Sequence, residues 1–178
     1  MYAFVAKTSP ITNRIVLSSL ISPHKVTHGI KVNALWDTGA TSSCIGKSLM
    51  QQLNMNPIAF TDVSHAGGRT NRVPVYLLDV ILPNNVRITG VHACQFDDAP
   101  DANFIIGMDI ITLGDFAITN LNNETTISFR IPSTQTIDFT KPAQPVTPSP
   151  KQIIASPTPK NVPCKCGSGK KYKHCCGK

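Results

Sequence analysis

No apolar run in this 178-residue sequence approaches the length needed to span a membrane. The amino-terminal stretch MYAFVAKTSPITNR also lacks a basic segment followed by a long apolar core. We therefore expect a soluble, cytoplasmic protein that does not bind membranes. With 41% apolar residues, the chain can form one globular core with an appendage, but a second large domain is not expected.

Acidic residues are absent from the carboxy-terminal part. Residues 139–178 contain eight lysines and no acid, which gives a formal charge of +8, whereas residues 1–138 hold nine basic against ten acidic residues, formally −1. A basic tail can dock to an acidic protein surface, a ribosome or a nucleic acid, or it can merely keep the protein soluble. Lysines without interleaved arginines and aromatics do not select among these functions.

Aromatic and acidic residues are both missing from residues 140–163, which contain seven of the fourteen prolines. Such a segment cannot pack a core, and its X-Pro steps favour an extended, semi-rigid chain. We therefore predict a folded domain at 1–138, a Pro-rich linker at 139–162 and a small module at 163–178.

Short β-like runs dominate the first domain, several of them alternate polar and apolar residues, and turn residues separate them. These runs cover residues 2–7, 14–21, 26–36, 73–82, 86–96, 115–120 and 125–131. Helical spacing is limited to residues 46–55 and 107–114. The sequence therefore predicts a mainly β domain with one or two short helices.

One carboxylate occupies an unusual context. In residues 34–46, ALWDTGATSSCIG, an apolar run ends at Asp37. A buried charge is costly unless it is paired, hydrogen-bonded or protonated, so Asp37 is either a turn residue that accepts backbone N–H groups or a residue that does chemistry. Hydrolysis of a peptide by water needs a base and an acid, and two adjacent carboxyls that share one proton supply both. A single Asp37 is half of such a site.

Two motifs carry a resemblance to a known family. The segment Leu35–Thr41, LWDTGAT, together with Ile105–Asp109, IIGMD, resembles the retropepsin family of aspartic proteases, most closely its cellular and retrotransposon-type branch. The resemblance covers roughly residues 10–131. It implies a closed β-barrel acid protease lobe, protein or peptide substrates, and a homodimer in which each subunit gives one Asp37 to the catalytic pair.

The same resemblance implies roles for the residues of the loop. Asp37 is the catalytic carboxylate, Thr38 hydrogen-bonds across the dimer, and Gly39 lets the two carboxylates lie nearly coplanar. Ala40 and Thr41 lie where substrate binds. Ala40 also replaces a hydroxyl that could stabilise the ionised pair, which predicts activity extending toward neutral pH.

Two further features lie outside that loop. Residues 64–76, SHAGGRTNRVPVY, loosely match the flap hairpin that covers substrate in the family, with Gly67 and Gly68 as its markers. Asp109 could be mistaken for a second catalytic carboxylate. No Thr-Gly follows it, however, and it opens a predicted helix, where an acidic residue is favoured, so we interpret it as structural.

The last sixteen residues, PCKCGSGKKYKHCCGK, hold four of the six cysteines: Cys164, Cys166, Cys175 and Cys176. A module this short needs a disulfide or a bound metal to fold, and four thiolates suit one structural Zn²⁺ whose binding drives folding. Disulfides or unmetallated thiols are the alternatives. The C-x-C-x8-C-C spacing resembles the zinc-binding SEC-C motif of the SecA translocation ATPase and many bacterial proteins. In that motif the last ligand is Cys or His, so Cys176 fits it and His174 is the alternative.

The other two cysteines, Cys44 and Cys94, lie in apolar contexts and are most simply small buried hydrophobes. A nucleophilic role lacks a histidine nearby in sequence.

The leading hypothesis is a bacterial, homodimeric aspartic endopeptidase that uses no cofactor for catalysis and carries a zinc module for docking. The alternative is a non-catalytic dimer of the same fold that binds proteins through its SEC-C tails. Nucleic-acid binding through the lysine-rich tail is a third possibility, which predicts a steep salt dependence of affinity.

Overall fold

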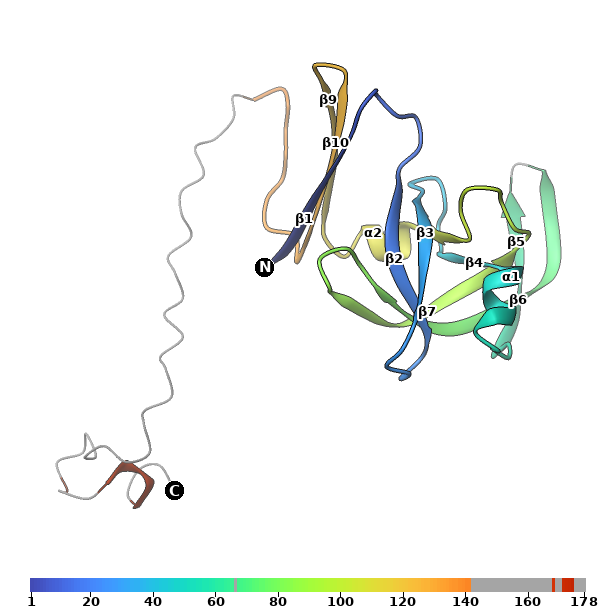
Figure 1. The fold of residues 1–178 in the computed structure, drawn as a ribbon, viewed down its shortest axis with the longest axis horizontal. Helices are drawn as coiled ribbons and strands as arrows, with labels where there is room; N and C mark the ends of the chain where they lie inside the picture. Colours follow the sequence, from blue (N-terminus) through green and yellow to red (C-terminus); the bar gives the residue numbers. More distant parts are fainter. Residues whose placement is uncertain (66, 142–167, 169–170, 175–178) are drawn as a thin grey trace. The chain divides into compact units, whose positions relative to one another are not determined.

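The computed structural model describes residues 1–65, 67–141, 168 and 171–174 (Figure 1). The chain divides into two units, residues 1–136 and 137–178. The described residues of the first unit form ten strands and two short helices, in agreement with the predicted fold class: β1 (Tyr2–Thr8), β2 (Val16–Pro23), β3 (Ile30–Trp36), β4 (Cys44–Gly46), α1 (Lys47–Gln52), β5 (Ala59–His65), β6 (Gly68–Ile81), β7 (Arg87–Phe96), β8 (Phe104–Ile106), α2 (Met108–Ile111), β9 (Asp115–Leu121) and β10 (Glu124–Ile131).

The second unit has few described residues. Asp138 accepts hydrogen bonds from the backbone and hydroxyl of Thr140, and it forms an exposed ion pair with Lys141 at 3.0 Å. A single 3₁₀ turn covers Tyr172–His174.

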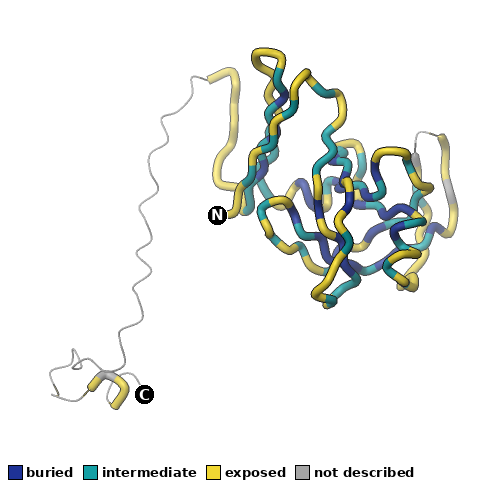
Figure 2. Tube along the Cα trace, viewed as in Figure 1, coloured by how far each residue is buried: buried dark blue, intermediate teal, exposed yellow. Residues whose placement is uncertain are grey.

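The main sheet closes into a barrel. Its strands follow the order β2-β3-β8-β4-β7-β6-β5, and β2 also pairs with β6, so six strands form a ring from which β5 is left out. The short strand β8 lies between β3 and β4, parallel to the first and antiparallel to the second. Figure 2 shows the buried residues concentrated along the barrel strands, and the predicted closed β-barrel is confirmed.

A second sheet, of order β1-β10-β9, joins the two ends of the domain. Its inner face meets Trp36 of the barrel strand β3. Phe116 stacks on the indole ring at 5.4 Å, while Phe129 and Phe4 approach it edge-on at 5.0 and 5.8 Å. Aromatic pairs at these distances add to the hydrophobic burial, so this cluster fixes the strand that leads into Asp37.

Helix α1 depends on a distant carboxylate for its start. Asp98 accepts the backbone N–H of Ser48 at 3.1 Å and the Ser48 hydroxyl at 2.9 Å. Gly46 precedes the helix, and a Cβ there would lie 2.5 Å from the same carboxylate. The first turn of α1 has no acidic residue of its own. Asp98, which is distant in sequence, therefore supplies the carboxylate that caps the helix.

Asp79 is the one charged side chain in the described ranges that is buried. His24 Nδ1 lies 2.8 Å from its carboxylate, and the Gly90 N–H and the Arg87 guanidinium donate to it at 3.0 and 3.1 Å. Burial raises the pKa of Asp79, but the hydrogen bonds from these groups and from the Lys25 backbone outweigh it and hold the pKa below its ordinary value. The ionised carboxylate therefore ties β2, β6 and β7 together.

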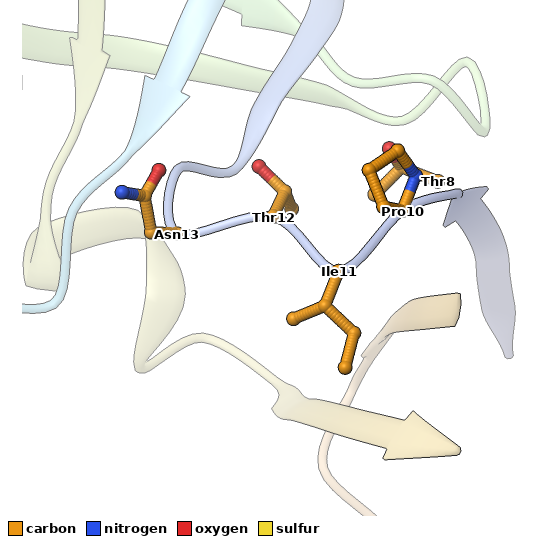
Figure 3. Close-up of a pocket in the computed structure, with 5 residues that line it drawn as sticks. All are labelled: Thr8, Pro10, Ile11, Thr12 and Asn13. Atoms are coloured by element: carbon orange, nitrogen blue, oxygen red, sulfur yellow. The ribbon is translucent and has the colours of Figure 1, made fainter. Parts of the chain in front are cut away.

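A hollow follows the connection between β1 and β2, lined by Thr8, Pro10, Ile11, Thr12 and Asn13 (Figure 3). Ile11 points to the opposite side from Pro10 and Thr12, and half of its surface is exposed. None of these five residues is a predicted site residue.

Across the described ranges, no helix combines the length and the apolar character that crossing a membrane requires.

Candidate active site

Asp37 lies immediately after β3, at the point where the strand leaves the barrel. Its backbone N–H donates to the Ile106 carbonyl at 3.0 Å, which continues the pairing of β3 with β8 by one residue. The side chain is half-buried, and its Oδ1 accepts the Gly39 N–H at 2.8 Å. The preceding residues are core because β3 is a barrel strand, and the carboxylate comes where the chain turns toward solvent.

The loop after Asp37 is held by the start of α2. The Met108 N–H donates to the Ala40 carbonyl at 2.8 Å, and the Asp109 N–H donates to the Thr41 carbonyl at 3.2 Å. The Ala40 N–H in turn donates to the Asp37 carbonyl at 3.2 Å, which closes a tight turn. The two motifs of the sequence therefore lie against each other in the fold.

Gly107 allows this close approach. A Cβ at Gly107 would lie 2.6 Å from the Ser42 carbonyl carbon, 2.7 Å from its oxygen and 2.9 Å from the Ala40 oxygen. These are backbone atoms, which cannot rotate away as a flexible side chain could. Only glycine fits here without moving the loop that carries Asp37.

A buried hydroxyl links the same two segments. Ser43 is fully buried, and its Oγ donates to Asp109 Oδ1 at 2.8 Å while accepting the Gly107 N–H at 3.2 Å. Asp109 Oδ1 also accepts the Ile110 N–H at 3.1 Å in the first turn of α2. Asp109 therefore opens the helix, as predicted, and its contacts are structural.

The other predicted residues of the loop face outward. Thr38, Gly39 and Thr41 are exposed, and Ala40 is half-buried. A Cβ at Gly39 would lie 3.2 Å from Asp37 Oδ1 and would crowd the hydrogen bond between these residues. The loop thus presents one carboxylate toward solvent, with small residues beside it.

The predicted flap is an antiparallel hairpin of β5 and β6. Gly67 lies in its turn and Gly68 begins β6 with φ of +125°, a conformation that L-residues rarely adopt. The register shifts between Thr61 and Val63, and Asp62 there accepts the Arg72 N–H at 3.1 Å and the Arg69 guanidinium at 2.7 Å. Polar contacts on an exposed surface therefore stabilise the β5–β6 hairpin.

The four tail cysteines, Cys164, Cys166, Cys175 and Cys176, lie outside the described residues, so their role as zinc ligands stays a prediction. Their chemistry fits the metal, because four thiolates make a complete tetrahedral donor set. His174 is described: it is exposed, and its backbone N–H donates to the Lys171 carbonyl at 2.9 Å.

The remaining cysteines differ from the expectation. Cys44 and Cys94 are free thiols that are only partly buried. They face each other as register partners of the parallel strands β4 and β7. Burial, followed by the neighbouring Cys94, Asp109 and Asp37, raises the pKa of Cys44 to about 12.

Two residues of the site were not identified from the sequence. Nothing in the local sequence distinguishes Ser43 from Ser42. Gly107 is part of the IIGMD motif, but the motif alone does not indicate its function. The signal for Gly107 was the motif itself, in which a glycine separates an apolar pair from a helix.

Chemically, the loop in one chain offers one oriented carboxylate. Such a group can act as a base or as an acid at a given moment, but the hydrolysis of an amide by water needs both. A second carboxyl that shares the proton would complete the site.

Comparisons with known proteins agree with the two motifs. Residues 23–110 match the family model described as aspartyl protease, and residues 161–178 match that of the SEC-C motif. Both resemblances inferred from the sequence are confirmed, in the predicted order along the chain.

Among solved structures, the fold is similar to a retropepsin-like aspartic protease from Rickettsia conorii, with 14% identity, a TM-score of 0.48, and 71% of this chain and 93% of that one covered. It is also similar to the EIAV protease in complex with the inhibitor HBY-793, with 20% identity, a TM-score of 0.47, and 58% and 90% of the two chains covered.

Among curated proteins, short segments match the protein translocase subunit SecA. The identity is 67% over 27 residues in the protein from Dichelobacter nodosus and 62% over 32 residues in that from Chlorobium phaeobacteroides. These matches cover 15% and 17% of this chain and only 3% of each SecA protein.

Proposed function

We propose that this protein is an aspartic endopeptidase that works as a homodimer, in which the two copies of Asp37 form one water-activating pair. The observation that carries the proposal is the position of Asp37 at the end of a barrel strand. Its carboxylate is oriented by the Gly39 N–H, and its loop is fixed by the start of α2. The match of residues 23–110 to the aspartyl protease family supports the same activity.

The two carboxyls would share a single proton. The ionised carboxylate takes a proton from the attacking water, and the protonated one donates to the carbonyl oxygen of the scissile peptide. Thr38 then joins the two loops across the two-fold axis, and Gly39 leaves room for the pair to lie coplanar. Ala40 and Thr41 border the bound peptide, and the hairpin with Gly67 and Gly68 covers it.

The experiment compares the full-length protein with Asp37→Asn on a mixture of unfolded proteins, with new termini identified by mass spectrometry between mild acid and neutral pH. Asn keeps the shape of the side chain but cannot share the proton, so we expect cleavage to fall roughly 10²–10⁴-fold. The matched control is Asp97→Asn, an exposed carboxylate outside the loop, which should cleave normally.

Cleavage by Asp37→Asn at the wild-type rate would contradict the proposal. Absence of cleavage in both proteins at every pH would favour the alternative, a dimer that only binds proteins through its SEC-C tails.

We also propose that Cys164, Cys166, Cys175 and Cys176 hold one structural Zn²⁺ and that the basic tail docks to an acidic protein or ribosomal surface. The metal would supply only folding energy to the module. Elemental analysis of the full-length protein should give one zinc per chain, and Cys164→Ser should lose it while Cys94→Ala keeps it. Comparing Cys176→Ala with His174→Ala identifies the last ligand, and retention of zinc by Cys164→Ser would refute the site.

A further inference from the structure

The two cysteines of the domain form a pair beside the candidate active site. Cys44 in β4 and Cys94 in β7 are register partners in a parallel pairing. Their neighbours Ile45 and Ala93 are fully buried in the barrel core. Because successive side chains alternate between the faces of a sheet, the two thiols lie together on the outer face.

The spacing of the strands suits a covalent link. Paired strands lie about 4.8 Å apart, and disulfides join residues whose Cα atoms are about 4.4–6.8 Å apart. Both cysteines are free and partly exposed, so a small oxidant in solution can reach them.

The two cysteines also contact the segment that follows the Asp37 loop. The Cys94 N–H donates to the Ser43 carbonyl at 3.1 Å, and the Cys44 thiol lies 3.6 Å from the Ser42 carbonyl. Ser43 is the residue whose hydroxyl bridges Gly107 and Asp109. A change in the spacing of β4 and β7 therefore acts directly on the contacts that fix the Asp37 loop.

Both thiols react slowly with oxidants at neutral pH. Burial raises the pKa of Cys94, and so does the charge of Asp109, while the pKa of Cys44 is about 12. At neutral pH the protonated thiols dominate, and since the thiolate is the reactive form, the pair stays reduced unless an oxidant is present in excess.

We propose that Cys44 and Cys94 are a modification site at which a peroxide forms a reversible disulfide that joins β4 to β7 next to the Asp37 loop. One thiolate attacks a peroxide oxygen and becomes a sulfenic acid, and hydroxide leaves. The second thiol attacks the sulfenic sulfur, the S–S bond forms and water leaves. In total two thiols lose two electrons, and one hydrogen peroxide is reduced to two waters.

The consequence for activity rests on the proposed function. The disulfide stiffens β4 where the chain leaves the Asp37 loop and changes the surface beside the carboxylate. Peptide cleavage should therefore fall on oxidation and return when dithiothreitol reduces the bond.

The experiment treats the full-length protein with hydrogen peroxide, blocks remaining thiols and digests it with trypsin. We expect a linked pair of peptides, residues 32–47 and 88–130, which reduction separates. The matched control is Cys94→Ala. It keeps Cys44 and all four tail cysteines, so oxidation of the tail affects both proteins equally.

Cleavage by the wild type should drop at least tenfold more than cleavage by Cys94→Ala after the same treatment. Absence of the linked peptides after this treatment, whether or not either cysteine is oxidised, would overturn the modification site. Linked peptides with equal loss of cleavage in both proteins would overturn its effect on activity. A protein that never cleaves contradicts the proposed function instead, because the linked peptides are detected without any activity.

Discussion

The Asp37 loop and the β5–β6 hairpin both depend on glycine, but for opposite reasons. At Gly107 the backbone is ordinary and space is missing, since a Cβ would lie 2.6 Å from the Ser42 carbonyl carbon. At Gly68 space is free, with no atom within 4 Å of a Cβ, and the backbone conformation is the constraint. Close packing therefore constrains the Asp37 loop, whereas the backbone conformation of the turn constrains the hairpin.

The polar contacts differ in the same way. Ser43 is fully buried between Gly107 and Asp109, whereas Asp62 and its two arginine partners lie on an exposed arm. Hydrogen bonds withdrawn from water are costly to break, while exposed ion pairs contribute little. These differences indicate that the Asp37 loop is rigid and that the β5–β6 hairpin can adapt its conformation.

The largest effect is expected for Gly107→Ala. The added methyl meets backbone atoms on two residues, so the loop must move away from α2. Overpacking of this kind should lower the free energy of unfolding by roughly 3 kcal/mol. Urea denaturation at a fixed protein concentration measures this loss. A loss smaller than that of the hairpin variants would contradict the claim that close packing makes the Asp37 loop the more constrained region.

Ser43→Ala should come next. It removes the hydroxyl that satisfies the buried Gly107 N–H and takes from Asp109 one of its two donors, at a cost of about 2 kcal/mol. Asp109→Asn is the matched control, because its amide oxygen can still accept from Ser43. Equal destabilisation by the two variants would show that the charge of Asp109, not the hydroxyl bridge, holds the loop.

Gly68→Ala tests the hairpin. The methyl has room, but φ of +125° strains any L-residue, so we expect a loss of about 1 kcal/mol in the free energy of unfolding. Denaturation is compared with that of Gly107→Ala under identical conditions. A larger loss than at Gly107 would mean that the turn, not the loop, is the more constrained region.

The smallest effect is expected for Asp62→Ala. The carboxylate is exposed, so its ion pair with Arg69 and its bond to the Arg72 backbone should contribute about 0.5 kcal/mol together. Raising the salt concentration should weaken the wild type toward the variant. A salt-independent loss above that of Ser43→Ala would contradict the distinction between the two regions.

Local patterns predicted most of the fold. The seven β-like runs correspond to β1, β2, β3, β6, β7, β9 and β10, because each is at least six residues long and rich in residues that favour strands. Strands β4 and β8 were missed since three residues are too few for a period to show. Most of β5 is exposed, so no apolar alternation marks it.

The Asp37 loop was readable from sequence because its motif is contiguous. The contacts that hold this loop in place could not be predicted in the same way. Ser43 meets Asp109 across 66 positions and Ser48 meets Asp98 across 50, and such contacts depend on strand register that no local pattern encodes. The pairing of Cys44 with Cys94 depends on strand register in the same way.

The central claim is that one active site needs Asp37 from two chains. The most direct test unfolds equal amounts of wild type and Asp37→Asn together, refolds them so that subunits mix, and measures peptide cleavage. A shared pair predicts about one quarter of the activity of the same total amount of wild-type protein, because mixed dimers are inactive. Activity of about one half, proportional to the wild-type chains present, would contradict the account, since each chain would then act alone.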